Sequence, residues 1–261
     1  MIYFIGAGPG AVDLITVKGK ELLEKADLII YAGSLVNPGL LQYAKPDCVI
    51  MDSAKMTLEE VIAAMVPAAQ EGKLVVRLHT GDPSVYGAHR EQIDMLRSYN
   101  LDFEIVPGVS SFCAAAAALD AEYTLPNVSQ SVIITRMEGR TPVPNKQKIA
   151  DYAAHKATMV IFLSSGMLDR LQTELIKGGY TADTPAAIVY KASWPDEKVV
   201  RCTVGTLAES AAKYNITKTA LITVGNFLGC EYDRSELYNP TFAHGFREAD
   251  PAKLNVKPEV K

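Results

Sequence analysis

The sequence lacks a long apolar run, a pairing pattern among its cysteines and an excess of positive charge. Its longest uninterrupted apolar stretch is Phe112–Leu119, mostly alanine and far shorter than the ~20 residues that span a bilayer. The four cysteines and four histidines are scattered, with no C-x-x-C pair, which argues against disulfides and against a sequence-local metal site. A net charge of −4 argues against nucleic acid as the main partner. We therefore expect no membrane span, no nucleic-acid partner and no protein-bound metal.

The composition is that of a folded globular protein, with 48% hydrophobic and 21% charged residues in a chain of 261. The chain runs from Met1 directly through an apolar segment to Gly6, with no basic region before it. This start resembles a first strand and not a secretion signal, so we expect a cytoplasmic protein.

Short apolar runs of strand length alternate with segments of helical spacing, which predicts an α/β fold with mostly parallel sheets. The predicted strands are Tyr3–Ile5, Leu28–Tyr31, Cys48–Met51, Leu74–Leu78, Phe103–Val106, Ser131–Thr135, Thr158–Leu163, Ala186–Tyr190, Val199–Thr203 and Ala220–Val224. The predicted helices are Val17–Lys25, Leu58–Gln70, His89–Tyr99, Ser110–Ala121, Lys146–Ala154, Met167–Gly178 and Leu207–Lys213. We expect a linker at residues 122–130 and two α/β domains, 1–121 and 122–261, the second of which ends in a charged tail after Asn239.

A glycine-rich motif, Gly6-Ala7-Gly8-Pro9-Gly10-Ala11, directly follows the first predicted strand. The pattern passes for a dinucleotide fingerprint. However, no acidic residue follows the second strand, and Pro9 removes an amide that a pyrophosphate would need. A tight turn that needs glycine dihedrals explains the motif at least as well.

Two further motifs stand at the carboxyl ends of predicted strands, where open α/β sheets bind ligands. Thr80-Gly81-Asp82-Pro83 offers a close backbone approach at Gly81 and carboxylate acceptors at Asp82, although Gly-Asp-Pro is also a common turn. Pro107-Gly108-Val109-Ser110-Ser111 precedes the alanine-rich helix, with either serine as its N-cap and the other hydroxyl free for a ligand. No Ser-His-Asp arrangement is compelling, and the catalytic residues stay unknown.

Taken in order, these motifs resemble the tetrapyrrole (precorrin) methylases. The resemblance continues through Met159–Ser164 and Val189–Glu197 and therefore covers nearly the whole chain. It implies two unlike α/β domains with S-adenosylmethionine in the cleft between them, and a homodimer. Carried over residue by residue, the cofactor-binding positions would be Pro9, Thr80, Gly81, Asp82, Val85, Ser110, Ser111, Leu163, Ala192 and Ala220.

Three segments resemble the branch of the family that methylates C11 of precorrin-4 or cobalt-precorrin-4. They are Tyr31–Val36, Thr135–Pro142 and Thr241–Arg247. The related uroporphyrinogen-III methylases carry a proton-transferring aspartate where this chain has Ala32, so their acid–base assignment cannot be transferred. The substrate would be a precorrin with several carboxylates, for which Arg136 and Arg140 are the predicted binding residues, together with Lys146 and Lys148 in a local basic cluster.

The expected reaction is methyl transfer from a sulfonium to carbon, an in-line displacement that needs alignment and no covalent nucleophile. Three alternatives remain open: a methylase acting at another position of a precorrin or uroporphyrinogen, a nicotinamide-dependent oxidoreductase, and a noncatalytic tetrapyrrole carrier. The sequence does not determine whether the substrate contains cobalt.

Overall fold

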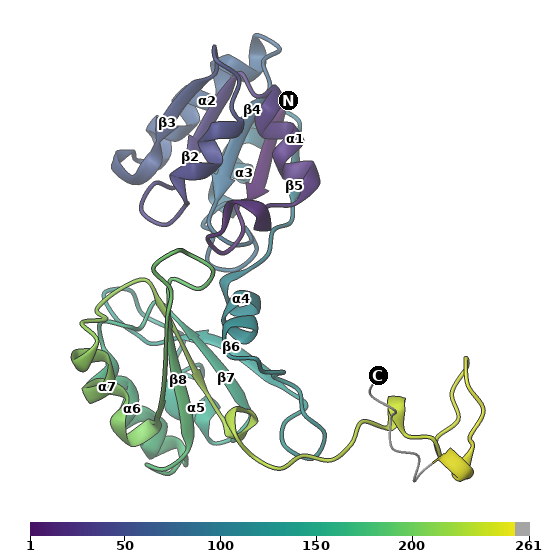
Figure 1. Cartoon of the computed structure of the whole chain (residues 1–261). Helices are drawn as coiled ribbons and strands as arrows, with labels where there is room; N and C mark the ends of the chain where they lie inside the picture. Colours follow the sequence, from purple (N-terminus) through teal and green to yellow (C-terminus); the bar gives the residue numbers. More distant parts are fainter. Residues whose placement is uncertain (254–261) are drawn as a thin grey trace.

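The computed structural model describes residues 1–253 and shows two lobes, each built around a five-stranded sheet (Figure 1). The first sheet has the strand order β3-β2-β4-β1-β5. Its strands are β1 (Ile2–Gly6), β2 (Leu28–Tyr31), β3 (Val49–Asp52), β4 (Val75–His79) and β5 (Phe103–Val106). All neighbouring pairs are parallel, so the carboxyl ends of the strands lie at one edge. Residues 254–261, the end of the expected charged tail, lie outside the described part of the chain.

The second sheet has the order β6-β7-β10-β8-β9 and mixed strand directions. Its strands are β6 (Val132–Arg136), β7 (Thr158–Phe162), β8 (Pro185–Tyr190), β9 (Lys198–Thr203) and β10 (Ala220–Val224). β6 and β7 are parallel, whereas β10 is antiparallel to both β7 and β8, and β9 is antiparallel to β8. The predicted α/β fold class with mostly parallel pairing is confirmed, and the antiparallel pairs are confined to this second sheet.

Helices cover the sheets and begin at the residues that local signals favour. The α-helices are α1 (Val17–Lys25), α2 (Leu58–Gln70), α3 (Arg90–Ser98), α4 (Ser111–Ala118), α5 (Ile149–Ala153), α6 (Leu168–Gly178) and α7 (Leu207–Lys213). Short 3-10 helices span Val12–Leu14, Pro38–Tyr43, Ser53–Lys55, Val204–Thr206, Asn226–Leu228, Glu236–Tyr238 and Pro251–Lys253. The Thr57 hydroxyl accepts from the Glu60 amide while the Glu60 carboxylate accepts from the Thr57 amide, a capping box that starts α2.

The two faces of each sheet bury separate apolar clusters. In the first lobe, α2 and α3 cover one face and α1 covers the other. In the second lobe, α5, α6 and α7 cover one face, and α4 packs on the opposite face through Ala114, Ala115 and Leu119. The domain boundary after residue 121 stays a prediction, although the helix just before it packs against the second sheet.

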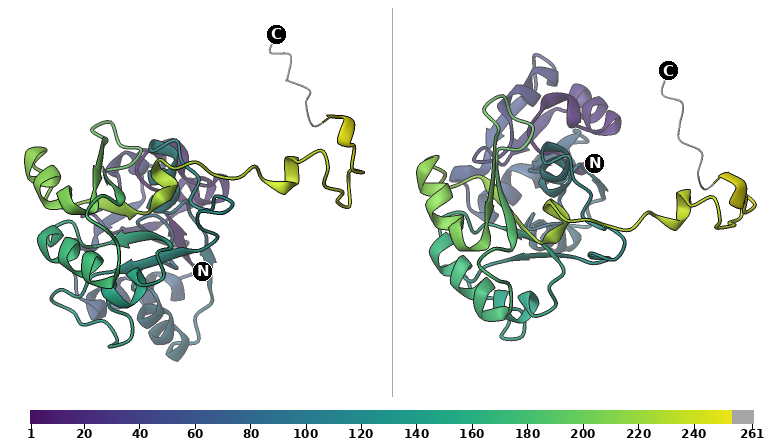
Figure 2. Two further views of the ribbon diagram at one scale, coloured as in Figure 1. Left: turned by 90° about the horizontal axis from the view of Figure 1, so that it is seen from below. Right: turned by 60° about the horizontal axis from the view of Figure 1, so that its bottom comes forward.

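After Phe227 and Leu228 the chain leaves the second lobe as an extended arm (Figures 1 and 2). Within residues 1–253, no helix is long and apolar enough to cross a membrane. Over the same range, no group of three or more His, Cys, Asp or Glu side chains is placed to hold a metal ion.

Candidate functional site

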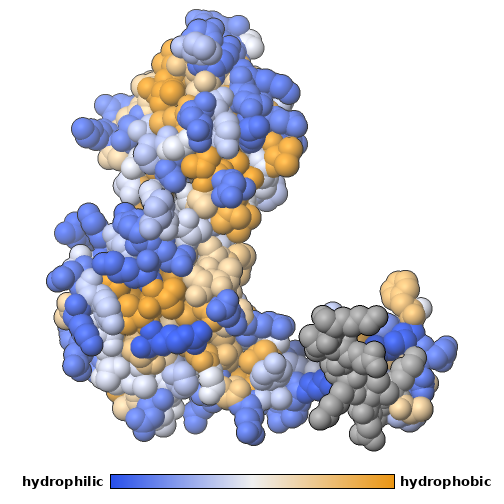
Figure 3. Space-filling model, viewed as in Figure 1, coloured by the Kyte–Doolittle hydropathy of each residue, from blue (hydrophilic) through white to orange (hydrophobic). Residues whose placement is uncertain are grey.

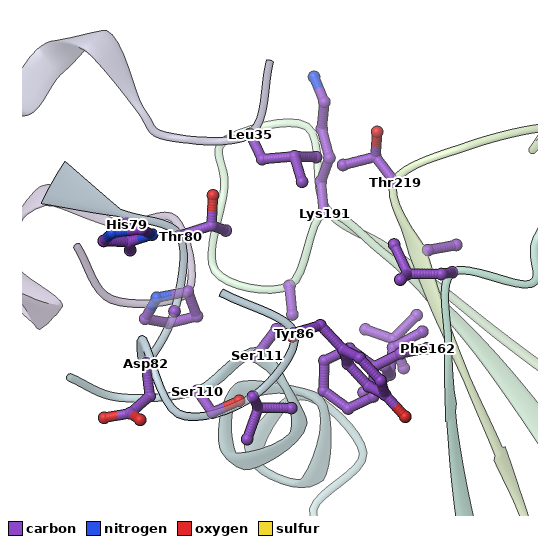
Figure 4. Close-up of a pocket in the computed structure, with 18 of the residues that line it drawn as sticks. Leu35, His79, Thr80, Asp82, Tyr86, Ser110, Ser111, Phe162, Lys191 and Thr219 are labelled. Carbon is purple, nitrogen blue, oxygen red and sulfur yellow. The ribbon is translucent and has the colours of Figure 1, made fainter. Parts of the chain in front are cut away.

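A cavity of about 280 Å³ is lined by residues from both lobes (Figure 4). This volume is near the lower end of the size range of small-molecule sites, roughly 300–1,000 Å³. The residues predicted to bind the cofactor all line it: Pro9, Thr80, Gly81, Asp82, Val85, Ser110, Ser111, Leu163, Ala192 and Ala220. Their role in binding stays a prediction, but the fold brings every one of them to the same cavity.

Three glycines let the loops after β1, β4 and β5 pack backbone against backbone beside the cavity. A Cβ atom on Gly6 would lie 2.5 Å from Gly108 Cα, and one on Gly108 would lie 2.3 Å from the Gly81 carbonyl oxygen. Gly8 and Gly81 also exchange two backbone hydrogen bonds, of 3.2 and 2.9 Å. The G-x-G motif therefore serves close loop packing, which agrees with the turn interpretation and gives no support to a nicotinamide site.

Asp82 links two of these loops. Its carboxylate accepts hydrogen bonds from the amides of Gly108 and Ser84, each at 2.8 Å, and from the Ser84 hydroxyl. Partial burial alone would raise the pKa of Asp82, but these hydrogen bonds outweigh it and hold the pKa below its ordinary value. In Figure 4 the carboxylate points away from Phe162. Both oxygens are thus engaged by the protein, so the predicted contact with ligand hydrogens stays a prediction.

Ser110 is at the N-cap position of α4, one of the two positions predicted for that role. Its side chain makes no cap hydrogen bond, and the structure gives its hydroxyl no partner among the described residues. The residue is buried and lines the cavity. Its hydroxyl is therefore available to a ligand beside the start of the helix.

Four residues that line the cavity hold a left-handed backbone conformation. The lining residues Tyr86, Leu163, Lys191 and Thr219 have φ values of 55°, 52°, 46° and 57°, in the left-handed region. Each such conformation costs on the order of 1–3 kcal/mol, and a β-branched threonine rarely adopts it. Strain held at several lining positions is typical of a functional site.

Aromatic side chains from the two lobes meet at the cavity. The rings of Tyr86 and Phe162 lie 5.4 Å apart between centroids and are tilted by 52° (Figure 4). Burial raises the pKa of the Tyr86 hydroxyl, against a smaller lowering effect of Arg136. This pair connects the loop after β4 to the end of β7.

A second set of contacts between the two lobes lies near Pro9, beside the cavity. The Trp194 indole Nε1 donates to the Pro9 carbonyl at 3.2 Å, and the Ala11 amide donates to the Ser193 hydroxyl at 2.9 Å. A Cβ on Gly10 would lie 2.0 Å from the Trp194 ring, so the indole fits only over a glycine. Sequence reasoning missed Tyr86, Phe162 and Trp194 as site residues, although Trp194 is the single tryptophan of the chain.

The predicted substrate-binding arginines do not line this cavity. The Arg136 guanidinium donates to the carbonyls of Thr141 and Pro142, at 3.2 and 2.7 Å, and so holds its own loop. It still lies close enough to Tyr86, which lines the cavity, to lower the pKa of that hydroxyl slightly. Arg140, Lys146 and Lys148 are exposed on the same loop segment. Their contact with a substrate stays a prediction.

His79, at the end of β4, is a buried imidazole that sequence reasoning did not single out. Its ring packs on Phe4 and His89, with centroids 5.9 and 6.0 Å away. Its Nε2 is buried without a hydrogen-bond partner among the described residues. Burial, with the nearby charge of Arg77 and the effect of His89, lowers the pKa of His79 to about 3. The imidazole is therefore neutral in the folded protein at neutral pH.

This lowered pKa makes stability depend on pH. Between pH 6.5 and 3 the unfolded chain binds a proton at His79 that the folded chain does not, so acidification favours unfolding. We expect the free energy of unfolding to fall by roughly 2 kcal/mol from pH 7 to pH 5 because of this residue. Urea titrations of wild type and His79→Gln should show a shallower pH slope in the variant. The exposed His155→Gln variant should keep the wild-type slope, and equal slopes in all three proteins would contradict the assignment.

The chain is similar to known enzymes along most of its length. The family model of Tetrapyrrole (Corrin/Porphyrin) Methylases matches residues 1–208. A Cobalt-precorrin-4 C(11)-methyltransferase of Methanocaldococcus jannaschii is 56% identical over 249 residues, covering 95% of this chain and 96% of that protein.

Solved structures of related enzymes are also similar to this chain along most of its length. The X-ray structure of the cobalt precorrin-4 methyltransferase CbiF has a TM-score of 0.86 and 50% identity, covering 88% of this chain and 96% of that one. A uroporphyrin-III C-methyl transferase of Thermus thermophilus, complexed with S-adenyl homocysteine, has a TM-score of 0.73 and 26% identity, covering 87% and 93%. With the motifs gathered at one strained cavity, these similarities establish that the chain belongs to the tetrapyrrole methylase family.

Proposed function

We propose that this chain transfers a methyl group from S-adenosylmethionine to C11 of precorrin-4 or cobalt-precorrin-4 during corrin ring synthesis. The observation that carries the proposal is the level of identity. It is 56% to a cobalt-precorrin-4 C(11)-methyltransferase and 35% to a uroporphyrinogen-III C-methyltransferase of Bacillus subtilis. The first match extends over nearly the whole of both chains, which favours a shared substrate over a shared fold alone.

The residues around the cavity fit a cofactor of this kind. Gly81 leaves open the space above the start of α4, and the Ser110 hydroxyl is free for a polar contact. Thr80 and the backbone near Gly81 would hold the polar parts of S-adenosylmethionine, with Val85 and Leu163 beside its apolar parts. When bound, the cofactor supplies an electrophilic methyl group on a positively charged sulfur.

The protein's contribution to the reaction is positioning. Tyr86 and Phe162 fix the two lobes relative to each other, and the Trp194 contact fixes them near Pro9. Alignment of a carbon nucleophile with a methyl group gives large rate gains without any covalent intermediate. Apolar side chains such as Leu35 and Val85 also keep water from the reacting groups. We further propose that the enzyme is a cytoplasmic homodimer, as the family resemblance implies.

The direct test is a methyl-transfer assay with purified protein. Precorrin-4 and cobalt-precorrin-4 are supplied separately with S-adenosylmethionine, and the product is analysed by mass spectrometry and NMR. We expect one added methyl group on C11. Methylation at another ring carbon would overturn the C11 assignment, and binding of either tetrapyrrole without methyl transfer would favour a carrier.

Charge at Arg140 should affect the substrate more than the cofactor. Arg140→Glu places a negative charge on the basic loop, where the substrate carboxylates are expected to bind. We expect KM for the tetrapyrrole to rise roughly three- to tenfold, with an effect that shrinks at high salt. Arg170→Glu makes the same charge change on α6 and should leave KM unchanged. Equal effects of both variants would show that only net charge matters.

A further inference from the structure

The arm, residues 230–253, has little contact with the lobes from which it extends. The Asp233 amide donates to the Pro126 carbonyl at 3.3 Å, in the linker that follows α4. Beyond this point, among the residues that the structure describes, the arm's hydrogen bonds join arm residues to one another. All three views show the arm running away from the body (Figures 1 and 2).

The outer part of the arm is nevertheless an ordered unit. The Arg247 guanidinium donates to the carbonyls of Leu237 and Asn239, at 3.0 and 2.7 Å. His244 and Arg247 exchange backbone hydrogen bonds of 2.9 and 3.0 Å. The Asp250 amide donates to the Pro240 carbonyl at 2.7 Å. These bonds hold the segment in one shape without help from the lobes.

The arm as a whole exposes large apolar side chains. They are Tyr232 (61% exposed), Leu237 (54%), Tyr238 (68%), Phe242 (45%) and Phe246 (100%). Scattered apolar residues are normal on a surface, but several on one short arm with no core of its own indicate a binding surface.

A second apolar surface is uncovered on α4. The helix, Ser111–Ala118, contains no charged residue, and helices that are apolar all round are normally buried. Its inner side packs on the second sheet, while Cys113 and Ala117, one helical turn apart, are exposed. The apolar colour of α4 is visible at the waist between the lobes, on the side toward which the arm extends (Figure 3).

We propose that the arm docks on a second copy of this chain, with its apolar side chains against the exposed face of the partner's α4. Each chain carries both surfaces, so a two-fold pair covers both at once with two equivalent contacts. The large side chains of the arm suit a helix face of small residues, which permits close approach. The proposal deepens the homodimer proposed above by naming its surface, and it does not depend on the methyl-transfer chemistry.

The area available is sufficient for a stable dimer. A fully covered aromatic side chain buries about 150–250 Å². The exposed parts of four aromatic residues and one leucine, from two arms, therefore supply on the order of 1,000 Å² before the surface that they cover is counted. Stable interfaces bury about 1,200–2,000 Å² in total.

The test is the mass of the full-length protein by sedimentation velocity across a range of concentrations. We expect wild type to be a dimer, and the double variant Tyr238→Asp with Phe246→Asp to be a monomer. The matched control is Tyr99→Asp with Tyr214→Asp, which changes two exposed tyrosines on the lobes and should remain dimeric. On the other surface, Ala117→Arg should give a monomer, whereas Ala212→Arg on α7 should not. Thermal melts establish that each variant is folded.

The outcomes separate the docking surface from the homodimer itself. A wild-type dimer that survives both the arm and the α4 variants would overturn the docking surface and leave the homodimer standing. A wild-type monomer at all concentrations would overturn both. Either result would leave the methyl-transfer function untouched, because the product assay measures that independently.

Discussion

Replacing Gly81 by valine is expected to abolish binding of S-adenosylmethionine while the protein stays folded. Gly81 has a φ of +61°, and a Cβ there would lie 3.5 Å from both Ser110 Cα and Ser111 N. The methyl groups of valine would extend beyond that point into the space over the start of α4. We expect calorimetric titration to show affinity weakened by at least about a hundredfold, or roughly 2.7 kcal/mol.

Gly72 provides a matched control for backbone strain. It has a φ of +80°, a Cβ there would meet no atom within 4 Å, and the residue does not line the cavity. Gly72→Val therefore strains the backbone as Gly81→Val does, without filling the proposed site. We expect both variants to lose stability and only Gly81→Val to lose cofactor binding. Normal affinity in a folded Gly81→Val protein would contradict the cofactor assignment.

Replacing Ala32 by aspartate is expected to slow methyl transfer by about tenfold or more. Ala32 lines the cavity, and the next residue, Gly33, donates its amide to the Asp52 carboxylate at 3.0 Å. A second carboxylate would add repulsion toward a polycarboxylate substrate, worth about 1–4 kcal/mol at 4 Å between the dielectric limits of water and a protein surface. Proton removal follows attack by the ring carbon, so a base at this position would not speed the methyl transfer itself.

Single-turnover rates against pH, with S-adenosylmethionine saturating and the tetrapyrrole below its KM, measure this effect. Ala32→Asn has nearly the same bulk without the charge, so it should be slowed much less than Ala32→Asp. Equal slowing of the two variants would assign the effect to bulk. A rate gain in Ala32→Asp that titrates with a carboxylate would show that a missing base limits this enzyme. It would contradict the proposal that the protein contributes only positioning.

The secondary structure followed from local signals. The predicted helices Val17–Lys25, Leu58–Gln70 and Leu207–Lys213 have the same bounds in the structure, because apolar spacing and capping residues act over a few residues. The direction of the strands in the second sheet was not predictable in this way. β10 follows α7 and lies antiparallel to both β7 and β8, whereas alternating elements suggest parallel crossovers. Only the antiparallel pairing of β8 with β9 follows from the short loop 191–197 between them.

The location of the site could also be predicted, because parallel strands bring their carboxyl ends, and the motifs that follow them, to one edge. The functions of individual side chains within it were harder to predict. Asp82 and Arg136 were expected to contact ligands. In the structure the Asp82 carboxylate accepts from the Gly108 and Ser84 amides. The Arg136 guanidinium donates to the Thr141 and Pro142 carbonyls. Such partners depend on loop conformations that no short pattern encodes.

By itself, the sequence determined the α/β class and the order of the elements, and its resemblance to a known family supplied the ten predicted cofactor positions that line the cavity. Hydrophobic periodicity and glycine placement act over a few neighbouring residues, so their effect does not depend on how the lobes are arranged. Only the tertiary structure decided the contacts between distant segments: Tyr86 with Phe162, Trp194 over Gly10, and the burial that lowers the pKa of His79. These depend on side-chain packing and left-handed backbone conformations that are stable only when the surrounding structure holds them.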